Sequence, residues 1–200
     1  RMDRHRMFTR IFTWNDEMID ADAPRYVKIN FAQRFPKMIP YDGATRIGPY
    51  SLACMIASNK ASDHLLELYT ERRDALRWFE ENHPDDFALY GRGWNGHTTR
   101  RGPPPPGMKR MTLQQHRFSI CYENARSLPG YITEKIFDCF IAGTIPIYLG
   151  APNINHYVPD DCYIDRREFI GYNDLYRYIT TMSVEEHQRR IESIQAFLQS

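Results

Sequence analysis

Two short apolar runs, RFSICYE (117–123) and IPIYLG (145–150), enclose one amphipathic segment, and this order leaves few possible folds. Each run has the length and composition of a buried strand. The segment between them, YITEKIFDCFIAGT (131–144), places Ile132, Ile136 and Phe140 on one stripe, as a helix lying on a sheet requires. A strand, a helix and another strand in this order predict a parallel sheet.

The same alternation recurs on both sides of this unit. Upstream, SLACMIASN (51–59) and DFALYG (86–91) have the pattern of strands, and the apolar residues of 61–84 predict a helix that stops at Pro84. Downstream, CYID (162–165) has the pattern of a strand, and two helices follow at 171–182 and 183–199, the second with Ser183 as its N-cap. The fold class is therefore predicted to be α/β, a Rossmann-like parallel sheet with helices on both faces.

The remaining segments show weaker patterns. Residues 1–44 are irregular apart from a short strand at RIFTWN, and we expect a remnant or interdomain segment there and one domain over 45–200. The segment 91–110 has the composition of a loop. Its prolines, Pro103–Pro106, predict an extended, rigid surface spacer.

Composition excludes several classes of function. The 200 residues carry 26 basic and 25 acidic side chains, a net charge of +1, which gives no support to nucleic-acid binding. No apolar run spans a bilayer or forms a signal peptide, and the 4 cysteines lack metal-type spacing. Buried free thiols and a cytoplasmic protein are expected. The basic C-terminal segment leaves peripheral association with the inner membrane open.

Several catalytic and cofactor motifs are absent from the sequence. Neither GxGxxG after a strand nor GxxxxGK[ST] occurs, so dinucleotide and P-loop chemistry lack their main support. HExxH and GxSxG are absent as well. The acidic triplet DAD (20–22) lies in the irregular N-terminal segment, where a loop or cap role is expected.

The remaining candidate residues for binding or catalysis lie at the junction that follows the strand 117–123. In such sheets ligands bind at the carboxyl ends of the strands, where N-termini of helices favour anions. Lys135 adds a positive charge there, and Glu134 can accept hydrogen bonds from hydroxyls. A nucleotide sugar needs both groups. Spacing alone, however, favours a solvated helix face that points Glu134, Lys135 and Asp138 away from the sheet.

A pattern of about 50 residues is similar to a known sequence signature. The segment FSICYENARSLPGYITEKIFDCFIAGTIPIYLGAPNINHYVPDDCYIDRREF, Phe118 to Phe169, resembles the signature of the α-1,3/4-fucosyltransferase family (glycosyltransferase family 10), with Tyr122 at a position that is usually Phe. Upstream, IASN (56–59) and FTWND (12–16) are also similar to segments of this family, FTWND to its bacterial members.

The resemblance implies the C-terminal, GDP-fucose-binding half of a two-domain GT-B glycosyltransferase that inverts the anomeric centre and requires no metal. Lys135 would neutralise the diphosphate, and Glu134 with Tyr131 would hold ribose or fucose hydroxyls. A second phosphate ligand would be an Arg, for which Arg72 fits best and Arg73 is a rival. By motif position, the implied donor-binding and catalytic residues are Arg72 or Arg73, Asn124, Tyr131, Glu134 and Lys135.

One part of the family pattern is missing from this sequence. The family binds its acceptor, an N-acetyllactosamine-like glycan, in an N-terminal domain that also carries the acidic general base. Residues 1–44 are too short for that domain, and the acids Asp16, Glu17 and Asp20 lie in no family base motif. An isolated module that binds GDP-sugars therefore stays open as an alternative. A GT-B transferase that uses another nucleotide sugar stays open as well, because selectivity for the base and the sugar depends on subtle differences.

Overall fold

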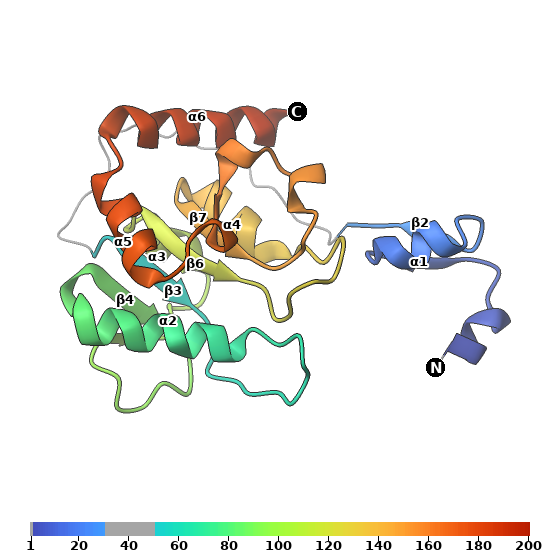
Figure 1. The fold of residues 1–200 in the computed structure, drawn as a ribbon, viewed down its shortest axis with the longest axis horizontal. Helices are drawn as coiled ribbons and strands as arrows, with labels where there is room; N and C mark the ends of the chain where they lie inside the picture. The colour runs from blue at the N-terminus through green and yellow to red at the C-terminus, as the bar shows by residue number, and fades with distance from the viewer. Residues whose placement is uncertain (1, 31–50) are drawn as a thin grey trace.

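The computed structural model describes residues 2–30 and 51–200. Its larger part is a six-stranded sheet with the strand order β5-β4-β3-β6-β7-β8, and neighbouring strands run parallel (Figure 1). The strands are β3 (Ala53–Ile56), β4 (Phe87–Tyr90), β5 (Arg100–Gly102), β6 (Phe118–Tyr122), β7 (Ile145–Leu149) and β8 (Ile164–Asp165). The predicted parallel sheet is confirmed.

The strand order identifies the centre of the fold. The chain builds outward from β3 to β5, returns to the middle, and builds outward again from β6 to β8. Right-handed crossovers then place the helices of the two halves on opposite faces, which is the Rossmann-like arrangement. The order reverses between β3 and β6, and a crevice is expected at their carboxyl ends.

Five helices accompany this sheet in the described part of the chain: α2 (Tyr69–Asn82), α3 (Lys109–Leu113), α4 (Glu134–Ala142), α5 (Tyr172–Thr181) and α6 (Val184–Gln199). Helix α2 buries Ala75, Leu76 and Phe79, which lie on one face. Helix α6 begins as predicted, because the Ser183 hydroxyl accepts a hydrogen bond of 3.1 Å from the backbone N–H of Glu186.

Two helices start later than the sequence predicts. The helix predicted over 61–84 begins only at Tyr69, because the Glu67 carboxylate caps the N–H groups of Tyr69 and Thr70 at 2.5 and 3.0 Å. The preceding Leu65 is 91% exposed and adds nothing to a packed helix face. Helix α4 begins at Glu134 rather than at residue 131, and it ends at Gly143 in the left-handed conformation that glycine favours.

The predicted loop 91–110 contains two elements that the sequence does not reveal. Strand β5 pairs with β4 but carries exposed Arg100 and Arg101, so it shows no apolar alternation. Helix α3 begins inside the segment, at Lys109. The run Pro103–Pro106 lines a hollow together with Ile56–Ser58.

The N-terminal residues form a small arm that Figure 1 shows beside the sheet. It consists of a 3-10 helix (Met2–Met7), β1 (Ile11–Thr13), α1 (Asp16–Ala21) and β2 (Tyr26–Lys28), and its two strands pair in parallel. The predicted strand at RIFTWN is confirmed, whereas α1 and β2 were not predicted. The predicted domain boundary at residue 44 falls outside the described residues and stays a prediction.

The packed core confirms one further prediction, the burial of the cysteines. Large apolar side chains of the sheet and of α2 are fully buried, among them Phe87 of β4, Phe118 of β6 and Phe79 of α2. All four cysteines are buried and free, as expected. Within the described ranges, none of the helices has the length and apolar character needed to cross a membrane.

Candidate functional site

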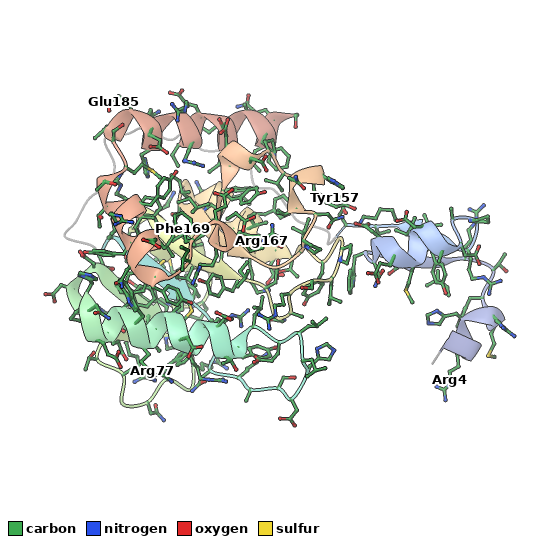
Figure 2. The ribbon with its side chains drawn as sticks, in the orientation of Figure 1. Arg4, Arg77, Tyr157, Arg167, Phe169 and Glu185 are labelled. Carbon is green, nitrogen blue, oxygen red and sulfur yellow. The ribbon has the colours of Figure 1, made fainter. Side chains whose placement is uncertain are left out.

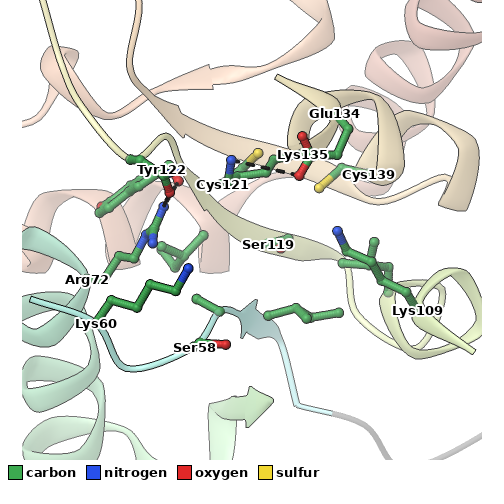
Figure 3. A pocket seen from close by; sticks show the side chains of 15 residues that line it. Ser58, Lys60, Arg72, Lys109, Ser119, Cys121, Tyr122, Glu134, Lys135 and Cys139 are labelled. Atoms are coloured by element: carbon green, nitrogen blue, oxygen red, sulfur yellow. Dashed lines mark hydrogen bonds and ion pairs between the residues drawn. The ribbon is translucent and has the colours of Figure 1, made fainter. Parts of the chain in front are cut away.

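A cavity of about 260 Å³ lies where the strand order reverses. Ile56–Ser58, at the end of β3, line one part of it, and Ser119–Tyr122 of β6 line another. This is the position at which open α/β sheets bind ligands. Figure 3 shows basic side chains from different elements facing this space. Among the described residues, its charged and amide side chains are Lys60, Arg72, Lys109, Asn124, Glu134 and Lys135.

A buried carboxylate lies at the end of β6, next to this cavity. Glu123 is fully buried, and its oxygens accept hydrogen bonds of 2.7 Å from both the backbone N–H and the hydroxyl of Thr133. The Lys135 ammonium donates to the same carboxylate at 2.9 Å and to the Thr133 hydroxyl at 2.7 Å. A buried charge needs such partners, so Glu123 fixes the first turn of α4 against the end of β6.

Lys135 and Glu134 therefore differ in orientation. The prediction that both point away from the sheet is wrong for Lys135, because the buried Glu123 draws its ammonium inward. The Lys135 side chain is 24% exposed and that of Glu134 is 49% exposed, with 3.9 Å between Lys135 Nζ and Glu134 Oε1. Both line the cavity: Lys135 is a cation bound to Glu123, and Glu134 is a more exposed carboxylate.

Arg72 reaches the cavity from the opposite wall. It is buried on α2, and its Nη2 donates to the carbonyl oxygens of Tyr122 and Glu123 at 2.6 and 2.8 Å. The same nitrogen donates to Asn124 Oδ1 at 3.1 Å. Burial lowers the pKa of the Arg72 guanidinium, and the charge of Glu123 is among the neighbours that oppose this. Arg72 thus holds the chain where β6 ends.

The rival Arg73 lies elsewhere. Its guanidinium donates to the carbonyl of Lys60 at 2.9 Å and to the Thr70 hydroxyl at 2.8 Å. Of the two arginines, Arg72 is the one that lines the cavity. The geometry therefore favours Arg72 as the candidate phosphate ligand, although the role itself stays a prediction.

Asn124 and Tyr131 are also brought together. Asn124 Nδ2 lies 3.5 Å from the Tyr131 hydroxyl, and Asn124 lines the cavity. Burial raises the pKa of the Tyr131 phenol, and the nearby Glu123 carboxylate adds to this, so the hydroxyl stays protonated at neutral pH. The structure thus brings Arg72, Asn124, Glu134 and Lys135 to one cavity, with Tyr131 adjoining Asn124.

Sequence reasoning missed three charged residues of this region. Glu123 directly follows the five buried residues of β6. A carboxylate directly after such an apolar run is a sequence signal that could have identified it as a site residue. Lys60 and Lys109 also line the cavity, but their neighbours in the sequence gave no such signal. Lys109 Nζ lies 2.5 Å from Asp138. Burial lowers the pKa of Lys109, but the hydrogen bond and charge of Asp138 outweigh it, and the net shift is upward.

This arrangement suits a small ligand that carries both negative charge and hydroxyl groups. Lys60, Arg72, Lys109 and Lys135 supply positive charge, and the N-terminus of α4 adds a partial one. Glu134 and Asn124 can hydrogen-bond to hydroxyls. In the described part of the chain, no group of His, Cys, Asp and Glu side chains could hold a metal ion.

Comparison with known proteins identifies the family. The sequence model for the C-terminal part of glycosyltransferase family 10 (fucosyltransferase) matches residues 50–190. The chain belongs to this family. The predicted membership is confirmed, and the matched range includes the whole six-stranded sheet and the cavity.

Curated relatives of this family 10 chain are fucosyltransferases. It is 34% identical over 71 residues to the Helicobacter pylori α-(1,3)-fucosyltransferase FucT, covering 36% of this chain and 15% of that protein. It is 33% identical over 81 residues to human α-(1,3)-fucosyltransferase 7, covering 39% and 23%. With the bovine 4-galactosyl-N-acetylglucosaminide 3-α-L-fucosyltransferase 9 it shares 25% identity over 131 residues, covering 64% and 32%.

Solved structures show the same fold. An α1,3-fucosyltransferase with GDP superimposes with a TM-score of 0.55 at 20% identity, over 75% of the family 10 chain and 46% of that protein. An α1,3-fucosyltransferase with GDP-fucose gives a TM-score of 0.54 over the same shares, also at 20% identity. The match thus spans less than half the length of these proteins, and the α/β Rossmann-like fold class is confirmed.

Proposed function

We propose that this chain is the donor-binding part of an inverting fucosyltransferase. It would move L-fucose from GDP-fucose to a hydroxyl of a glycan acceptor in an α-1,3 or α-1,4 linkage. The observation that carries the proposal is the cavity lined by Arg72, Glu134 and Lys135 at the reversal point of the sheet, in a chain of family 10.

The cavity has the groups that the donor half of this reaction needs. As the bond from fucose C1 to the phosphate oxygen breaks, negative charge grows on the departing GDP. Lys135, Arg72 and the N-terminus of α4 would stabilise that charge. Because the charge develops in the transition state, its stabilisation lowers the barrier of the reaction. Glu134, Asn124 and Tyr131 would hold hydroxyls of the sugar or ribose.

The acceptor half is assigned by analogy with relatives. The bovine relative is named for fucosylating a 4-galactosyl-N-acetylglucosaminide, so we propose an N-acetyllactosamine-like acceptor. The acceptor oxygen would attack C1 while the carboxylate of an acidic residue, acting as general base, takes the proton of the acceptor hydroxyl. We attribute that base, and acceptor binding, to the N-terminal half that the family pairs with this one.

The proposed reaction uses the fixed cations of the cavity, and no divalent metal is assigned to it. We therefore expect fucosyl transfer by the whole protein to proceed unchanged when EDTA is added. A loss of transfer that Mg²⁺ or Mn²⁺ restores would contradict this part of the proposal.

Donor binding is tested by isothermal titration calorimetry. The wild type is expected to bind GDP-fucose more tightly than GDP-mannose or UDP-galactose. Lys135→Ala should weaken GDP binding by about tenfold to a hundredfold, because a charged hydrogen bond is lost. Lys135→Arg should recover part of that loss.

Arg77→Ala, on the exposed face of α2, is the control for this titration. It should bind GDP like the wild type. Unchanged GDP binding by folded Lys135→Ala would overturn the phosphate role. Tighter binding of another nucleotide sugar would favour a different transferase, and absence of an acceptor domain in the parent gene would favour an isolated binding module.

A further inference from the structure

The N-terminal arm is joined to the larger part of the molecule through the Asp16 carboxylate. Its oxygens accept hydrogen bonds from Lys28 at 2.6 Å, from Tyr157 at 2.7 Å and from Asn153 at 2.8 Å. Figure 2 labels Tyr157 on the side of the sheet domain that faces the arm. Asp16 therefore ties its own arm to the segment that follows β7.

The same contact reaches the loop between β6 and α4. Asn153 Oδ1 accepts a hydrogen bond of 2.9 Å from the backbone N–H of Gly130, and the Asp16 N–H donates to the carbonyl of Pro129 at 3.3 Å. Gly130 has a positive φ of +78°, and a Cβ added there would lie 2.3 Å from the carbonyl oxygen of Trp14. The loop and the arm are in close backbone contact.

An aromatic contact continues toward the cavity. The rings of Trp14 and Tyr131 lie 4.8 Å apart and are tilted by 54°. The Tyr131 hydroxyl is next to Asn124 Nδ2, and Asn124 Oδ1 accepts from Arg72. A continuous series of contacts thus connects the arm with the cation-lined wall of the cavity.

We propose that Trp14 and Asp16 are positioning residues of the donor site. By holding the segment 129–131 against the arm, they set the place of the Tyr131 ring and, through its hydroxyl, the orientation of Asn124. Neither residue lines the cavity, so they act through Tyr131. This inference rests on the proposed binding of GDP-fucose.

The experiment measures GDP-fucose affinity in the whole protein by calorimetry, with circular dichroism and urea unfolding to confirm that each variant is folded. Trp14→Ala should weaken binding by about threefold to tenfold, the range expected for loss of an aromatic pair. Trp14→Phe should restore most of the affinity. Asp16→Asn should have a smaller effect, about twofold to fivefold.

Matched controls come from the same arm. Phe12→Ala removes an aromatic ring that is 63% exposed, and Glu17→Gln neutralises an exposed carboxylate beside Asp16. Both should bind like the wild type. A double-mutant cycle tests the route: in the Tyr131→Ala background, Trp14→Ala should cause no further loss.

The outcomes separate the two proposals. If the wild type does not bind GDP-fucose, the proposed function fails, and this inference fails with it. If the wild type binds and folded Trp14→Ala and Asp16→Asn bind equally well, only the positioning role is overturned. Additive losses in the double-mutant cycle would also overturn it, because Trp14 would then act independently of Tyr131.

Discussion

Glu123 and Asp16 are two carboxylates near the loop between β6 and α4, and they differ in burial. The Glu123 side chain is 0% exposed, whereas that of Asp16 is 17% exposed. Glu123 binds groups within the sheet domain, and Asp16 joins two segments that lie apart in the sequence. The inner carboxylate is therefore part of the packed fold, whereas the outer one connects the arm, through Asn153, with the loop at Gly130.

The largest effect is expected at the inner carboxylate. Glu123→Ala leaves the Lys135 ammonium and the Thr133 N–H without their partner and should lower the free energy of unfolding by about 3–5 kcal/mol. Urea denaturation measures this. Glu134→Ala, at the neighbouring exposed carboxylate, should change stability by about 0.5 kcal/mol or less. Equal effects of the two substitutions would refute the contrast drawn from burial.

Arg72 should come next, because it holds the carbonyl of Glu123 from the other side. Arg72→Ala leaves buried carbonyl oxygens of Tyr122 and Glu123 without a donor, and the expected loss is about 2–3 kcal/mol. Arg73→Ala is the control, with an expected change below about 1 kcal/mol. A reversed order of the two arginines in urea unfolding would show that Arg73 carries the structural role.

The outer carboxylate should give the smallest effect and a distinct pH dependence. Burial raises the pKa of Asp16, but hydrogen bonds from Lys28, Tyr157 and Asn153 and the charge of Lys28 outweigh it, so the pKa is lowered from its ordinary 3.8. The ionised form is therefore favoured by folding. Its stabilisation is complete above the unfolded pKa and is lost as pH falls through the folded pKa.

Asp16→Asn provides the measurement of that contribution. At neutral pH the variant should be less stable than the wild type by about 0.5–1 kcal/mol. The difference should shrink as pH falls from about 5 toward 2. A difference between Asp16→Asn and wild type that stays constant down to pH 2 would contradict the assignment.

Much of the fold could be predicted because burial leaves a periodic pattern. The runs that became β3, β4, β6 and β7 are apolar along their length, as strands covered on both faces must be. Strand β5 escaped prediction because its Arg100 and Arg101 are exposed at the edge of the sheet. The start of α2 escaped because Leu65 and Leu66 continue the apolar pattern into a segment that the Glu67 cap excludes from the helix.

The sequence by itself determined the parallel α/β class and the family, because these follow from periodicity and from one long local motif. It also named the candidate site residues Asn124, Tyr131, Glu134 and Lys135, with Arg72 or Arg73 as a further candidate. Only the tertiary structure decided between Arg72 and Arg73 as a cavity residue, since that depends on which side of α2 faces the end of β6. It also decided that Lys135 turns inward to Glu123 and that the arm carrying Asp16 meets the loop at Gly130. The spacing of these residues along the chain does not indicate that they are in contact in the folded protein.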